Sequence, residues 1–129
     1  MEPTIKSGRQ SAEHVDISGS CFHNVNLCNA EFNDVNMSNS SFHNINFSNV
    51  SISAAQIGGA KFRHIGPPPD KNGKQDRQKG VLFEEVELNN SIFRKSNLSN
   101  VQITDCNIKG MVIDGIAVKD MFDAYRKQY

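Results

Sequence analysis

The feature of this sequence that most restricts its fold is a large apolar residue that recurs every five positions. The recurrence is unbroken from Ile17 to Phe62 and resumes from Phe83 to Val118, which gives eighteen repeats. The residue two places before each one is small or aliphatic, as Val25 is before Leu27. The large residues are Ile17, Phe22, Leu27, Phe32, Met37, Phe42, Phe47, Ile52, Ile57 and Phe62, then Phe83, Leu88, Phe93, Leu98, Ile103, Ile108, Ile113 and Val118.

A period of five fits neither of the two common regular structures. On an α-helix, five residues advance by about 500°, so the apolar residues would spiral around the axis instead of forming a stripe. In a flat β-strand, an odd period would place successive apolar residues on opposite faces. The chain must therefore turn a corner in every repeat. This predicts an all-β solenoid in which each repeat points two side chains inward.

The number of repeats in one coil follows from residues that match at longer spacing. Phe22, Phe42 and Phe62 are twenty positions apart and would lie in one column if four repeats made one coil. Eighteen repeats then give about 4.5 coils, stacked at the strand spacing of about 4.8 Å. Asn24 and Asn44 would lie one coil apart, so we expect their side-chain amides to form a ladder on the outside.

One segment, residues 66–80, interrupts the repeat. Phe62 and Phe83 are 21 positions apart, one more than a multiple of five, and the residues between them are rich in Pro, Gly and charge. These features predict a protruding, mobile loop with a local charge of about +2. Two hypotheses remain for this loop: it is either a solvated excursion or an element that binds a partner. The candidate partner-binding residues are Lys71, Lys74, Arg77 and Lys79.

The C-terminal segment changes period. Its apolar residues follow the i, i+3, i+4, i+7 spacing of a helix over residues 119–129, which would cap the last coil or dock on a second copy. The capping or oligomer residues are Met121, Phe122 and Tyr125, following Val118. We thus expect one domain with an N-terminal cover (1–14), a first repeat block (15–65), the loop (66–80), a second repeat block (81–118) and the C-terminal helix.

Several repeats resemble those of the pentapeptide-repeat family, whose consensus is Ala, Asp or Asn, Leu and two free positions. The best matches are residues 25–29, 30–34 and 96–100, with the sequences VNLCN, AEFND and SNLSN. The resemblance implies a right-handed quadrilateral β-helix. The resemblance also includes family members of the Qnr type. These bind DNA gyrase or topoisomerase IV as acidic mimics of DNA and are often dimers joined at their C-terminal ends.

The charge balance and the hydrophobicity argue against binding to nucleic acid or membranes. Fourteen basic residues balance fourteen acidic ones, so the net charge is zero and no global field favours nucleic acid or a membrane surface. No stretch has the apolar length of a leader or a membrane span, which predicts a cytoplasmic protein. Three cysteines without framework spacing are expected to be reduced thiols.

No arrangement of residues has the spacing of a catalytic centre or a phosphate-binding loop, so we expect neither an enzyme nor a cofactor. One cluster could hold a soft divalent metal, namely Cys21, His23 and His43, although ordinary outward side chains explain it as well. The chain is therefore predicted to be a non-enzymatic module that binds another protein, with an immunity or antitoxin role as one form. Inhibition or protection of gyrase and topoisomerase IV is the alternative.

Overall fold

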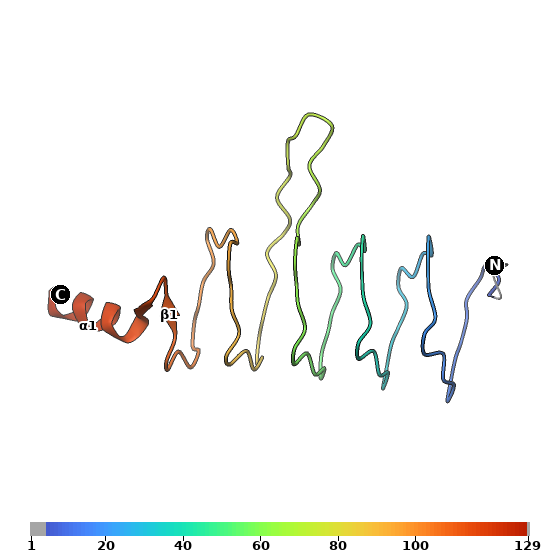
Figure 1. Ribbon diagram of the computed structural model, residues 1–129, viewed down its shortest axis with the longest axis horizontal. Helices are drawn as coiled ribbons and strands as arrows, with labels where there is room; N and C mark the ends of the chain where they lie inside the picture. The colour runs from blue at the N-terminus through green and yellow to red at the C-terminus, as the bar shows by residue number, and fades with distance from the viewer. Residues whose placement is uncertain (1–4, 129) are drawn as a thin grey trace. The chain divides into compact units, whose positions relative to one another are not determined.

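A computed structural model describes residues 5–128 of the chain (Figure 1). Its regular elements follow one another near the C-terminus: strand β1 (Val112–Ile113), strand β2 (Ile116–Ala117) and helix α1 (Val118–Gln128). The chain divides into unit 1 (Met1–Ala60) and unit 2 (Lys61–Tyr129), and each is described by itself. In both units the five-residue repeats form a series of backbone corners. Residues 5–13 precede the repeats, and the first four residues of the predicted N-terminal cover lie outside the described part.

Each corner has one residue with a positive φ angle, two places after the large apolar residue. In the repeats these angles lie near +55° to +78°, as at Asn24 (56°) and Asn29 (62°). This left-handed region is unfavourable for most side chains and is best tolerated by Gly, Asn and Asp, which explains the abundance of Asn in the sequence. The corner residues are Gly19, Asn24, Asn29, Asp34, Asn39, Asn44, Asn49, Ala54 and Gly59 in unit 1, and His64, Glu85, Asn90, Lys95, Asn100, Asp105 and Gly110 in unit 2.

Two kinds of corner alternate along the chain. In a closed corner, the carbonyl of the large apolar residue accepts a hydrogen bond from the amide three places later, as Leu27 does from Ala30 at 3.0 Å. The positive φ then falls on the third residue of the turn, which is the geometry of a type II turn. In an open corner this hydrogen bond is absent. Closed corners follow Ile17, Leu27, Met37, Phe47, Ile57, Leu88, Leu98 and Ile108.

The two kinds of corner differ in their large apolar residue. Phenylalanine precedes six of the eight open corners in the repeats, at Phe22, Phe32, Phe42, Phe62, Phe83 and Phe93. Among the eight closed corners it precedes one, at Phe47. The chain thus has a period of ten residues within its period of five.

Most closed corners have a second local hydrogen bond, made by an Asn or Asp side chain. The side-chain oxygen of Asn26 accepts a hydrogen bond from the amide of Cys28 at 2.9 Å, and Asn46 accepts one from Ser48 at the same distance. This Asx turn fixes the chain direction before the corner. The outer asparagines therefore have a local role at corners, and their laddering between coils stays a prediction. The Asx residues are Asp16, Asn26, Asn36, Asn46, Asn97 and Asn107.

Most of the large apolar side chains of the repeats are exposed. Phe22 is 52% exposed and Leu27 is 51% exposed, and within residues 5–128 Val118 alone is buried. The rings of Phe42 and Phe47 nevertheless meet edge to face, with centroids 5.6 Å apart. The large residues of these two consecutive repeats thus lie on a common side of the chain.

The repeat ends in a β-hairpin. Strands β1 and β2 pair antiparallel, with Val112 opposite Ala117, and the loop Asp114-Gly115 has φ angles of 48° and 80°. Two positive φ angles at an Asp-Gly pair define a type I′ turn, which folds the chain back over two residues. The period had predicted further repeats around Ile113 and Val118. The structure has this hairpin instead, and Val118 begins α1.

Helix α1 matches the C-terminal helix expected from the apolar spacing. Asp120 lies in its first turn and Arg126 and Lys127 in its last, which complements the helix dipole. Lys119 and Asp123 form an exposed ion pair at 3.1 Å, one turn apart. The amide of Val118 donates a hydrogen bond to the carbonyl of Met111 at 3.0 Å, which ties the start of α1 to the last closed corner.

Candidate functional site

Residues 66–80 form an excursion that leaves the repeat and returns to it (Figure 1). The amide of Asp70 donates a hydrogen bond to the carbonyl of Lys74 at 2.7 Å, and the amide of Gly73 donates one to the carbonyl of Asp70 at 2.9 Å. Gly73 has a φ of 78°, so the tip has the arrangement of a three-residue hairpin loop. The protruding loop predicted from the sequence is present, and it has a defined hairpin tip.

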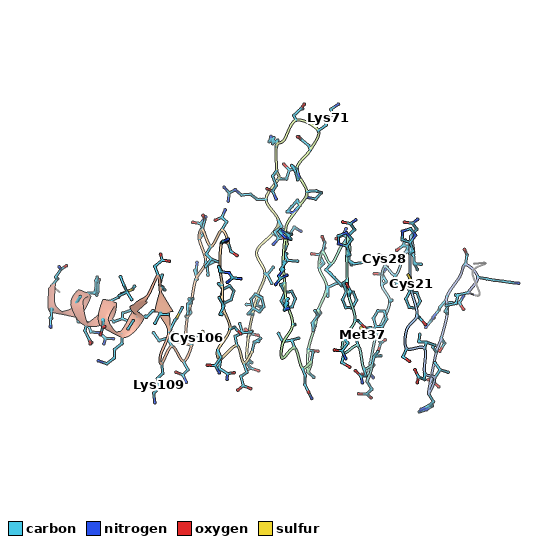
Figure 2. The ribbon with its side chains drawn as sticks, in the orientation of Figure 1. Cys21, Cys28, Met37, Lys71, Cys106 and Lys109 are labelled. Carbon is cyan, nitrogen blue, oxygen red and sulfur yellow. The ribbon has the colours of Figure 1, made fainter. Side chains whose placement is uncertain are left out.

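The carboxylate of Asp70 holds this tip together. Its Oδ1 accepts hydrogen bonds from the amides of Asn72 at 2.8 Å and Lys74 at 2.9 Å. Nearer the repeat, the side-chain amide of Gln75 donates a hydrogen bond to the carbonyl of Pro67 at 2.6 Å and joins the two arms of the loop. The turn leaves Lys71 at the outer end of the excursion (Figure 2).

The predicted binding residues Lys71, Lys74, Arg77 and Lys79 are all exposed. Within residues 5–128 the structure has one ion pair, Lys119–Asp123, so these four side chains are not neutralised by carboxylates there. The acidic residues that follow the loop, Glu84, Glu85 and Glu87, form no ion pair with it. The loop therefore presents its positive charge to solvent.

The alternation of corners shows where the loop sits in the repeat. Phe62 precedes an open corner at His64, and Phe83, the first large residue after the loop, precedes another at Glu85. Because the corners alternate, a closed corner is expected between these two open ones. Two repeats of the regular length would separate Phe62 from Phe83 by ten positions, whereas the actual separation is 21. The loop therefore takes the place of a single closed corner, enlarged by eleven residues.

Next to the base of the loop, two segments of unit 2 line a hollow of about 300 Å³. Phe62, Arg63 and His64 form one side, and residues 94–96 form the other. Arg63 and Arg94 are 31 residues apart, which is one coil of twenty plus the eleven added by the loop. The hollow thus brings together residues that hold the same place in two repeats of unit 2. The residues of the far side are Arg94, Lys95 and Ser96.

The sequence-predicted metal candidates are not gathered into a site. No group of three His, Cys, Asp or Glu side chains within the described part of the chain is placed to hold a metal ion, and Cys21, His23 and His43 all lie in that part. Cys21, Cys28 and Cys106 are free and exposed thiols.

The C-terminal candidates lie on α1, where Phe122 and Val118 line a second hollow together with large residues of the last coil, Ile103 and Ile108. Phe122 is 44% exposed and carries the guanidinium of Arg126 at 5.6 Å from its ring centroid. Val118 and Phe122 of α1 thus lie next to large residues of the last repeats, while Met121 and Tyr125 are 37% and 63% exposed, and capping by this helix stays a prediction.

A comparison with protein families agrees with this geometry. The family of pentapeptide repeats matches in eight copies over residues 13–49, 30–65 and 79–110, which is about two thirds of the chain. The chain belongs to the pentapeptide-repeat family. The matched segments leave out residues 66–78 of the loop and stop at Gly110, just before the hairpin of β1 and β2. A pentapeptide-repeat chain is built for a β-helical solenoid and for the kind of protein interaction that such scaffolds support.

No curated protein and no solved structure matches this pentapeptide-repeat chain significantly. Among residues 5–128 the structure contains no helix with the length and hydrophobicity needed to cross a membrane.

Sequence reasoning missed the basic residues Arg63, Arg94 and Lys95. Their signal was present, because Arg63 and Arg94 hold the same place in their repeats. This equivalence becomes visible only when the loop is treated as one enlarged corner, because the two arginines are 31 and not twenty residues apart.

Proposed function

We propose that this pentapeptide-repeat chain closes into a right-handed quadrilateral β-helix of about four coils, since the hairpin replaces the last two expected repeats, and acts as a non-enzymatic module that binds another protein. The corrected register supports four repeats per coil. When the loop counts as one corner, large residues of like size fall in the same column. One column contains Phe22, Phe42, Phe62 and Phe93, and another contains Ile17, Met37, Ile57, Leu88 and Ile108. Residues of like size stack in both columns, which favours tight packing.

The exposed interior supports closure of the coils. Phe93 is 63% exposed and Val81 is 66% exposed, and most other large residues of the repeats are 39–72% exposed. Burial of one such side chain stabilises a fold by about 1.5–3 kcal/mol. The same closure lets backbone amides and carbonyls pair between coils instead of with water. Both effects drive the coils together.

The observation that best supports a binding function is the enlarged corner between Phe62 and Phe83. Every other corner in the matched repeats keeps the minimal length, so a hairpin of this size has no role in stacking the coils. Long loops that project from a rigid scaffold are commonly the binding elements of a protein. This loop has a hydrogen-bonded tip and presents four unpaired cationic side chains, as an element for contacting an acidic surface would.

The test is affinity capture from the source cell with the intact protein and with a variant that lacks only the loop. The variant removes residues 67–77 and carries Gln78→Leu, so that Phe62 and Phe83 return to a spacing of ten residues. We expect one specific partner to be captured by the intact protein and lost with the variant. Equal capture by both would place the binding function elsewhere on the chain.

Binding to a topoisomerase, the alternative function, requires a different surface charge. A mimic of duplex DNA needs dense negative charge, whereas this chain has no net charge and a basic loop. A gyrase supercoiling assay with added protein separates the two functions, because only the alternative predicts a change in supercoiling at micromolar protein.

A further inference from the structure

The hollow beside the loop is basic. Arg63 and His64 face Arg94 and Lys95 across it, and we call these four residues the basic corner. All are exposed, and none forms an ion pair within the described residues. The loop leaves the repeat two residues after His64, so the basic corner lies directly at its base. Positive charge is therefore present both in the loop and at its base.

Acidic residues occupy the other open corners of unit 2. In order along the chain, the open corners are basic at 63–64, acidic at Glu84 and Glu85, basic at 94–95 and acidic at Asp105. In a coil with four corners, successive open corners lie on opposite edges. The charges are therefore segregated, with one cationic edge and one anionic edge, and the zero net charge of the chain conceals this.

The backbone at Lys95 supports a role for its charge. Lys95 has a φ of 55°, a conformation that costs a residue of this type about 1–2 kcal/mol relative to glycine. Corners elsewhere in the repeats are mostly Asn, Asp or Gly, and in the described residues Lys95 and Glu85 are the two with long charged side chains. A strained corner that keeps a lysine points to selection for the cation and not for the turn.

We propose that the basic corner is the binding site for an acidic segment of a partner protein. The inference rests on the proposed function and specifies its partner chemistry. The guanidinium groups of Arg63 and Arg94, one coil apart, can each bind a carboxylate with paired hydrogen bonds.

The charge pattern favours an acidic protein segment over nucleic acid. Tight binding of a polyanion requires many phosphates to be neutralised along an extended track. Here the cationic edge is short, and the acidic corners on the opposite edge would repel a polyanion that wrapped around the solenoid. A short run of Asp or Glu meets the basic corner without reaching the acidic one.

The experiment measures the affinity of the full-length protein for a fluorescent oligoglutamate peptide by anisotropy, with oligoglutamine as the uncharged peptide. The test variant is Arg63→Gln/Arg94→Gln. Its control is Lys109→Gln/Lys127→Gln, which lowers the net charge equally, and Lys109 lies at the opposite edge of unit 2 from Lys71 (Figure 2). Circular dichroism and thermal unfolding verify that both variants fold like the parent.

We expect oligoglutamate to bind and oligoglutamine not to bind. The test variant should bind about tenfold more weakly, because each exposed ion pair contributes up to about 1 kcal/mol. The control should bind like the parent, and added salt should weaken binding to the parent. Equal weakening of test and control, no binding of oligoglutamate, or tighter binding of a single-stranded DNA oligonucleotide would each overturn the inference. Capture of a partner that depends on the loop would survive those results, so the two proposals fail separately.

Discussion

The amide nitrogen of Ser18 lies 2.9 Å from Oδ1 of Asp16 and donates a hydrogen bond to that carboxylate. Five other closed corners have an asparagine at the equivalent position, as Asn26 and Asn36 show. The hydrogen bond from the Ser18 amide, helped by one from the Ser18 side chain, holds the pKa of Asp16 below its ordinary value of 3.8. A pKa lowered by folding means that Asp16 stabilises the fold above the ordinary value. This stabilisation is lost as the pH falls through the lowered pKa.

Replacement of Asp16 by asparagine should remove this pH dependence. The variant keeps the side-chain acceptor and loses the titrating group, so its stability at neutral pH should be close to that of the parent. Urea unfolding at a series of pH values gives the difference in the free energy of unfolding between the two proteins. That difference should move in favour of the variant as the pH falls below 3.8. A constant difference over the whole range would show that the hydrogen bond does not depend on ionisation.

The corner residue Asn39 should tolerate glycine and reject a β-branched side chain. Asn39 has a φ of 63° and is the third residue of the closed corner between Met37 and Ser40. Asn39→Gly should change the free energy of unfolding by less than about 0.5 kcal/mol, whereas Asn39→Val should lower it by about 1–2 kcal/mol. Thermal unfolding of both variants measures this. A valine variant as stable as the glycine variant would contradict a left-handed corner at this position.

Ala54 offers the opposite change, a substitution that stabilises. Ala54 is an open-corner residue with a φ of 53°, where alanine is strained and most other corners have Asn, Asp or Gly. Ala54→Gly and Ala54→Asn should each raise the free energy of unfolding by about 0.5–1 kcal/mol. Ala55→Gly is the matched control, because residue 55 has no positive φ and should lose stability. Lower stability in both Ala54 variants would exclude strain at this corner.

The sequence predicted the period, the loop and the C-terminal helix because each depends on local chemistry. An apolar residue every five positions, a Pro- and Gly-rich interruption and an i, i+4 apolar stripe all leave direct marks in the chain. Membership of the pentapeptide-repeat family confirms the first of these, and α1 agrees with the third. The sequence also contained the Asp114-Gly115 pair of the hairpin, but the residues around it keep the five-residue spacing and concealed it.

The alternation of corners could not be read from the apolar pattern alone. Whether the amide after Asn29 reaches the carbonyl of Leu27 depends on backbone angles at two residues, and side-chain polarity does not report them. The basic corner was hidden for the same reason. Arg63 and Arg94 become equivalent only when the loop counts as one closed corner, and that requires the kinds of corner on both sides of it.

The register of the loop makes a sharp prediction about its removal. After deletion of residues 67–77 with Gln78→Leu, the chain reads Ile65, Gly66, leucine, Lys79, Gly80, Val81, which has the form of the repeat at Val25–Ala30. Gly80 then falls at the positive-φ position of a closed corner, where glycine carries no steric penalty. Because a shorter connection also costs less entropy to close, the free energy of unfolding should be unchanged or higher by about 1 kcal/mol.

The control for this variant deletes two further residues. Without residues 67–79, Phe62 and Phe83 are eight positions apart, so the large residues after the loop can no longer stack in phase with those before it. We expect a loss of more than about 2 kcal/mol, since a shift in register moves apolar side chains out of the interior. Urea unfolding of the two deletion variants compares them directly. If the longer deletion were as stable as the shorter one, the loop would not stand in for a closed corner, and the equivalence of Arg63 with Arg94 would fail with it.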